Sequence, residues 1–134
     1  MSGRPFFDTN VLVYALGHAD ARTQTAEALL AAGGVISVQV LNELANVARK
    51  KLGMAWDDID DALGAIRTLC PSPLAITTEI HDHARRIAEK YGYGMYDALI
   101  AAAALEAECD MLYSEDMQDG QRLEGRITIR NPFR

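Results

Sequence analysis

The chain has 134 residues, a formal net charge of −6 and 49% hydrophobic residues. This length fits a single domain over residues 1–134, and the hydrophobic content is sufficient for a buried core. The acidic balance excludes a simple basic nucleic-acid binder, and the sequence shows neither a long apolar run nor a signal-peptide pattern, so we expect a cytoplasmic protein with no membrane partner.

In the first half of the chain, short apolar runs alternate with helical patterns. "PFFD" predicts a buried strand over residues 5–8, and "NVLVYALG", which follows it after Thr9, favours a short helix. A second helix is expected in "DARTQTAEALLAAGG", and a second short strand in "VISV". Ser37 would cap the next helix, in which leucine and alanine recur at helical spacing.

The second half continues with helices and ends with strands. Helices are predicted in "WDDIDDALGAIRTLC", in "TTEIHDHARRIAEKYG" and, most strongly, in "MYDALIAAAALEAEC". Short strands are expected in "LAI", "MLYS" and "RITIR". Strands that alternate with helices pair in parallel through right-handed crossovers, so the sequence predicts an α/β fold with a central, mainly parallel sheet.

Several acidic residues are expected at one edge of this sheet, because sites in open parallel sheets form at the carboxyl ends of the strands. Asp8 ends the first predicted strand, Glu43 follows the second, and Asp116 and Asp119 follow "MLYS". Each acid also has an ordinary explanation as a helix cap or a solvated surface residue. Four or five acids that converge on one edge predict a functional cluster instead.

Asp97 is a further member, in the first turn of an almost entirely apolar helix. No Lys or Arg occurs between residues 91 and 121, so no cation near Asp97 in the sequence can pair with it. Because an unpaired buried charge is costly, the partner of Asp97 is either a residue distant in sequence or a group that does not belong to the chain, such as a metal ion. Clustered carboxylates repel one another, so they must protonate or bind cations, and oxygen ligands select Mg²⁺ or Mn²⁺. Two such ions about 4 Å apart can activate a water for attack on a phosphodiester.

The stretches "FFDTNVLVYA", "ISVQVLNEL", "YDALIAAAAL" and "LYSEDMQDG" resemble, in this order, the motifs of the PIN-domain family, in particular its VapC-like toxins from type II toxin–antitoxin systems. The resemblance implies a three-layer α/β/α fold and an Mg²⁺- or Mn²⁺-dependent endoribonuclease. It also implies three partners: an RNA substrate, an antitoxin protein and a second copy in a homodimer. By position, the resemblance assigns catalysis and metal binding to Asp8, Glu43, Asp97 and Asp116, and it adds Asn10, Ser114 and Asp119 as further site residues.

Other functions are compatible with parts of this pattern. A haloacid-dehalogenase-like phosphatase needs a second acid two residues after the strand-end Asp8, where this chain has Asn10. A phosphoryl-accepting receiver domain needs a paired acid before that position, and the sequence has none there. A non-catalytic PIN-like module that binds RNA or protein remains an alternative, because intact metal ligands do not prove that the protein is catalytic.

The basic run Arg49–Lys51 has two interpretations: it is an ordinary exposed surface, or it binds a phosphate backbone.

Overall fold

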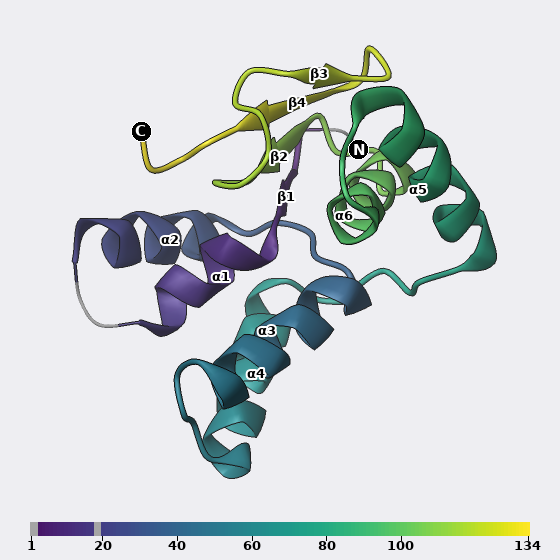
Figure 1. The fold of residues 1–134 in the computed structure, drawn as a ribbon. Helices are drawn as coiled ribbons and strands as arrows, with labels where there is room; N and C mark the ends of the chain where they lie inside the picture. Colours follow the sequence, from purple (N-terminus) through teal and green to yellow (C-terminus); the bar gives the residue numbers. More distant parts are fainter. Residues whose placement is uncertain (1–2, 18–19) are drawn as a thin grey trace.

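The computed structural model describes residues 3–17 and 20–134, which form six helices and four strands (Figure 1). In chain order these are β1 (Pro5–Phe7), α1 (Thr9–Leu16), α2 (Ala21–Ala32), α3 (Val38–Lys50), α4 (Trp56–Leu69), α5 (Thr78–Tyr91), α6 (Met95–Glu106), β2 (Met111–Tyr113), β3 (Arg122–Leu123) and β4 (Ile127–Arg130). None of the described helices is long and apolar enough to cross a membrane.

The central sheet has the strand order β1-β2-β4-β3. β1, β2 and β4 are parallel, and only the edge strand β3 runs antiparallel to its neighbour β4. The predicted mainly parallel sheet is therefore confirmed. In this register Phe7 lies beside Tyr113, and Tyr113 beside Arg130, so the three parallel strands end at the same edge.

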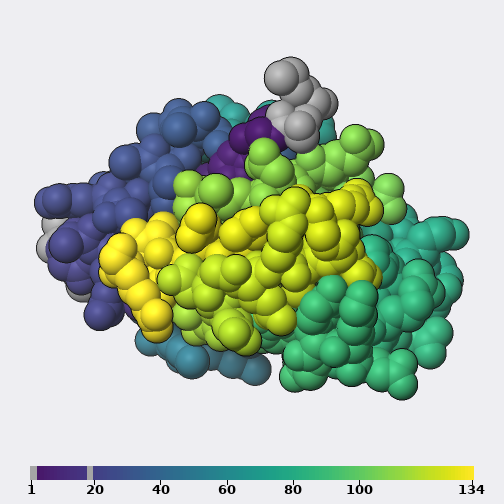
Figure 2. Space-filling view, turned by 90° about the horizontal axis from the view of Figure 1, so that it is seen from above, coloured from purple at the N-terminus to yellow at the C-terminus, as the bar shows by residue number. Residues whose placement is uncertain are grey.

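The helices form layers on both sides of the sheet, as the predicted α/β/α architecture requires (Figure 1). α1 packs on α2 on one side, α5 packs on α6 on the other, and the α3–α4 hairpin extends below them. Figure 2 shows the yellow C-terminal segment between the blue helices and the green ones. The interior position of α6 explains its composition, because all residues from Ala98 to Leu105 are buried.

Two of the predicted strands, in "VISV" and "LAI", do not form in the structure. "VISV" forms only isolated bridges, from Val35 to Phe6 and from Ser37 to Leu74, and the second of these is also all that remains of the strand expected in "LAI". The reason is local: the Ser37 hydroxyl accepts from the Val40 N–H, so α3 already begins at Val38. β3 was not predicted, because its two residues lie in a polar loop.

Gly34 is required where the chain enters this region from α2. A Cβ at this position would clash with Cε2 of Phe7 and would lie 2.9 Å from the carbonyl oxygen of Pro5. We expect Gly34→Ala to lower the free energy of unfolding by about 1–3 kcal/mol, because the Phe7 ring that would have to shift is fully buried. Chemical denaturation would measure this change.

Gly64→Ala is the matched control. Gly64 lies in α4, where an added Cβ would meet no atom outside its own turn of helix within 4 Å. Alanine favours a helix over glycine, so this variant should be more stable by about 0.5–1 kcal/mol. Equal effects of the two substitutions would contradict the close contact at Gly34.

Candidate active site

Asp8 lies where β1 ends and α1 begins. Its backbone N–H donates to the carbonyl of Tyr113 (2.9 Å), and its carboxylate caps α1 by accepting from the Thr9 N–H (2.7 Å). The other carboxylate oxygen accepts from the Ser114 hydroxyl (2.7 Å) and from the Asn10 side-chain amide (3.4 Å). Asp8 is thus both a helix cap and the centre of a network that joins two distant segments.

Burial raises the pKa of the Asp8 carboxyl from 3.8 to about 7. The hydrogen bonds from Ser114 and Thr9 lower this pKa, because they favour the ionised form, whereas the charges of Asp97 and Glu43 raise it further. Only 3% of Asp8 is exposed, so water offers its negative charge little stabilisation. Among the described residues, no Lys, Arg or His forms an ion pair with it.

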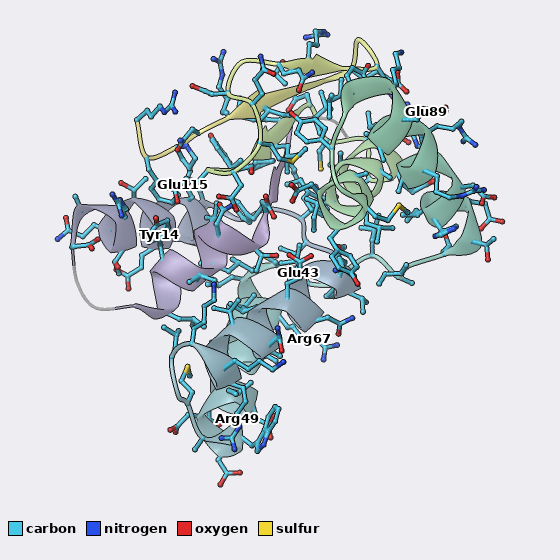
Figure 3. All side chains as sticks on the ribbon, viewed as in Figure 1. Tyr14, Glu43, Arg49, Arg67, Glu89 and Glu115 are labelled. Atoms are coloured by element: carbon cyan, nitrogen blue, oxygen red, sulfur yellow. The ribbon has the colours of Figure 1, made fainter. Side chains whose placement is uncertain are left out.

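Glu43 extends from α3 toward the start of α1. Its two carboxylate oxygens accept from the Thr9 hydroxyl and from the Gln39 amide, both at 2.7 Å. Figure 3 shows Glu43 near the centre of the molecule, whereas Arg49 of the same helix lies far out on the α3–α4 hairpin. Sequence reasoning missed Thr9 and Gln39, although a residue four positions before Glu43 shares its helix face.

Asp97, in the first turn of α6, is half-buried and accepts no hydrogen bond from any described residue. Burial raises the pKa of its carboxyl, and the charges of Asp116 and Glu43 raise it further. The neighbours of Asp97 are therefore other carboxylates, and the described part of the chain supplies no cation to pair with it.

Asp116 is held in the loop that follows β2. The Asn10 amide donates to its carboxylate (3.1 Å), and the Asn10 side-chain oxygen accepts from the Glu115 N–H (3.1 Å). Ser114 fixes the same loop, because its hydroxyl oxygen accepts from the Met117 N–H (3.1 Å). Asn10 and Ser114, which the resemblance added as further site residues, thus form hydrogen bonds with Asp8, and Asn10 also does so with Asp116.

Asp119 has a different contact in the same loop. Its carboxylate accepts from the Asn131 N–H (2.9 Å), and its charge is not among those that raise the pKa of Asp8 or Asp97. A residue that the sequence did not suggest, Tyr93, also fastens this loop. The Tyr93 hydroxyl donates to the side-chain oxygen of Gln121 and accepts from the backbone N–H of Gln118 (3.1 Å). These two bonds connect the loop to the segment just before α6.

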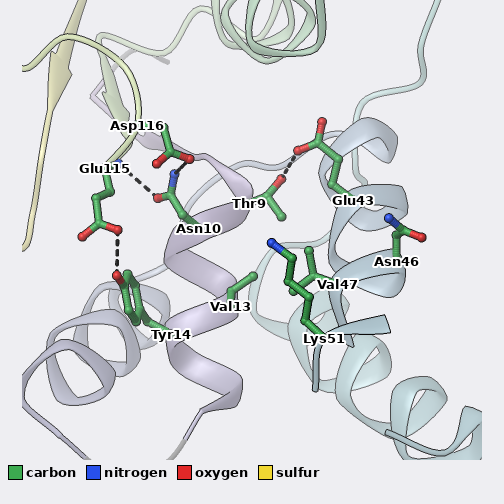
Figure 4. Close-up of a pocket in the computed structure, with 10 residues that line it drawn as sticks. All are labelled: Thr9, Asn10, Val13, Tyr14, Glu43, Asn46, Val47, Lys51, Glu115 and Asp116. Carbon is green, nitrogen blue, oxygen red and sulfur yellow. Dashed lines mark hydrogen bonds between the residues drawn. The ribbon is translucent and has the colours of Figure 1, made fainter. Parts of the chain in front are cut away.

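A groove of about 420 Å³ runs beside the acids, between α1 and α3 (Figure 4). We call it the α1–α3 groove; its lining residues are Thr9, Asn10, Val13, Tyr14, Glu43, Asn46, Val47, Lys51, Glu115 and Asp116. Two of the four predicted acids, Glu43 and Asp116, line one end of it. Asp8 and Asp97 are not among the lining residues, and they contribute to that end through the charges and hydrogen bonds described above.

The donor set suits a hard divalent cation. All four acids carry oxygen atoms that could serve as ligands, and no described residue donates a hydrogen bond to the Asp97 carboxylate. As the described side chains lie, no three His, Cys, Asp or Glu groups are close enough to hold one ion by themselves. Mg²⁺ does not require this, because it usually keeps several waters and takes one or two carboxylates from the protein.

Several solved structures share this fold at low sequence identity. A toxin–antitoxin complex from Klebsiella pneumoniae has a TM-score of 0.73 at 20% identity, over 96% of this chain and 97% of that chain. VapBC2 from Rickettsia felis, bound to a promoter DNA fragment, has a TM-score of 0.68 at 22% identity, over 98% of each chain. VapC20 from Mycobacterium tuberculosis, a toxin that cleaves the sarcin–ricin loop, has a TM-score of 0.67 at 23% identity, over 84% of this chain and 89% of that chain.

The search of curated protein sequences found no significant match. The family model described as "PIN domain" matches residues 6–119, a span that contains all the acids discussed above. The fold, the order of the motifs and this match agree. The chain therefore belongs to the PIN domain family.

Proposed function

We propose that this protein is a metal-dependent endoribonuclease and the toxin of a toxin–antitoxin pair. The observation that carries the proposal is the state of Asp97. It is half-buried, accepts no hydrogen bond from the described residues, and has a pKa raised by burial and by the charges of Asp116 and Glu43. A purely structural role would give this carboxylate a donor, and a metal site explains why it has none.

In this proposal Asp8, Asp97 and Asp116 would hold the divalent ion, Mg²⁺ or Mn²⁺, directly or through waters that the ion keeps, and Glu43 would bind it directly or through water. The bound ion supplies an activated water and neutralises charge on the phosphodiester. The chain's own hydrogen bonds keep the ligands oriented: Ser114 holds Asp8, and Thr9 holds Glu43. No covalent intermediate with the protein is needed.

Membership of the PIN family supports nuclease activity. The neighbours in Klebsiella pneumoniae and Mycobacterium tuberculosis are described as a toxin–antitoxin complex and as a toxin that cleaves the sarcin–ricin loop. These descriptions support RNA as the class of substrate and an antitoxin as the protein partner. We also propose, from the family resemblance, that the protein forms a homodimer and acts in the cytoplasm.

RNA cleavage with controlled metal tests the proposal. The purified chain should cleave RNA in Mg²⁺ or Mn²⁺, stop when the metal is chelated, and resume when it is restored, because the carboxylates alone repel the phosphodiester. Gel analysis of total RNA would show the products. Binding of RNA without cleavage in either metal would favour the non-catalytic module instead.

A further inference from the structure

The charge of this protein creates a problem for any nuclease function. The chain carries −6 overall, and the proposed site gathers four acids, yet an RNA strand is itself a polyanion. Affinity for nucleic acid comes largely from cations that contact phosphates. The question is therefore which positive charge near the acids is free to make such a contact.

The α1–α3 groove is lined by charges of both signs. Glu43, Asn46 and Val47 of α3 line it together with Lys51, the C-cap of that helix, and Lys51 is the only cation among the lining residues that the structure describes. The backbone positions of Glu43 and Lys51 are eight residues apart, about 12 Å along the helix axis, and the Lys51 side chain then reaches back from its own position toward Thr9. A nucleic-acid strand carries one phosphate per about 3.4 Å of stacked helix, so this length spans more than one phosphate.

The side chain of Lys51 follows the groove toward the acids. Helical side chains lean toward the N-terminus of their helix, and Figure 4 shows the ammonium group of Lys51 extending back between α1 and α3, toward Thr9. Val13 and Val47 form the apolar walls beside it. An anion in the groove would therefore meet this charge without any change in the helix.

Lys51 is also the member of its basic run with no other established role. Arg49 donates to the carbonyl of Met54 (3.1 Å) and lies 5.1 Å from the centre of the Trp56 ring, so it holds the α3–α4 turn together. Lys50 lies outside the groove and, with Arg49, already complements the C-terminal dipole of α3. Lys51 is exposed and forms no ion pair with a described residue.

We propose that the RNA strand runs along the α1–α3 groove and that Lys51 binds a phosphate of the strand away from the bond that is cleaved. The inference rests on the proposed ribonuclease function, and it adds where the substrate lies. Lys51 would act on affinity for RNA of any sequence, because a phosphate contact carries no sequence information. It would not touch the reacting atoms.

The test compares Lys51→Ala, Lys51→Arg and the adjacent control Lys50→Ala. Binding of a labelled single-stranded oligoribonucleotide of mixed sequence is measured over a range of salt concentrations, with Asp97→Asn in every variant so that the RNA stays intact. For Lys51→Ala, the dependence of log binding constant on log salt should become shallower by about 0.7, because one phosphate contact of a single strand is lost. Lys51→Arg and Lys50→Ala should keep the slope of the parent chain.

Cleavage kinetics of the three variants, without the Asp97 substitution, give a second readout. Lys51→Ala should raise KM about fivefold with kcat nearly unchanged, as expected for a contact made equally before and during the reaction. Equal slopes for Lys51→Ala and Lys50→Ala would overturn the proposal. So would an effect of Lys51→Ala confined to the binding of a protein partner. A parent chain that cleaves no RNA would refute the proposed function, whereas the salt slopes would still decide the role of Lys51.

Discussion

Asp97→Asn is expected to lower the rate of RNA cleavage by at least about two orders of magnitude while the chain stays folded. The substitution removes one charge and one ligand from the proposed metal site but keeps nearly the same volume. It breaks no hydrogen bond, because Asp97 accepts none from the described residues. Single-turnover cleavage in Mg²⁺ would measure the loss, and circular dichroism would confirm the fold.

Asp110→Asn is the matched control for this experiment. Asp110 is exposed and precedes β2, whereas the site lies beyond the other end of that strand. Its substitution removes the same charge and should leave the rate near that of the parent chain. A folded Asp97→Asn protein that cleaves RNA at the parent rate would refute the assignment of Asp97.

The stability of the metal-free protein is expected to fall as the pH rises from about 4 through about 7. Burial raises the pKa of Asp8 from 3.8 to about 7, so the folded state binds more protons than the unfolded state within this interval. The contribution of Asp8 to the free energy of unfolding is fully present below its pKa in the unfolded chain, and it is lost as the pH rises through its pKa in the folded chain. This loss amounts to at most about 4 kcal/mol. Thermal melting in a chelating buffer at several pH values would show the decline.

Asp97 allows a second prediction, because burial and repulsion from the charges of Asp116 and Glu43 also raise the pKa of its carboxyl. At pH about 7 without metal, Asp97→Asn should melt at a higher temperature than the parent chain, because one of the mutually repelling charges is gone. Mg²⁺ or Mn²⁺ should then stabilise the parent more than the variant, since an ion that binds only the folded state adds stability. A clearly lower melting temperature for Asp97→Asn, with equal metal shifts, would assign Asp97 to a structural role.

The sequence by itself determined the features that depend on near neighbours. Ser37 caps α3 as predicted, and the left-handed Gly92 ends α5 at the last residue of the predicted helical segment, because caps of both kinds are local signals. The uninterrupted apolar pattern of α6 requires a helix buried on all sides, and the structure has one. The mainly parallel sheet was predicted correctly, but the predicted alternation of strands and helices was wrong, because α1 to α6 all lie between β1 and its parallel neighbour β2.

Only the tertiary structure decided which side chains meet. Ser114 donates to Asp8 across 106 positions of sequence, and no periodicity reports such a contact. Asp119 follows the same strand as Asp116, yet the chain fold brings it to the backbone of Asn131. Lys50 and Lys51 are identical neighbours in sequence, and the rotation of about 100° per helical residue sends only Lys51 into the α1–α3 groove. Local sequence patterns therefore determine most of the helices, whereas the packing of helices and strands determines which residues each charged side chain contacts.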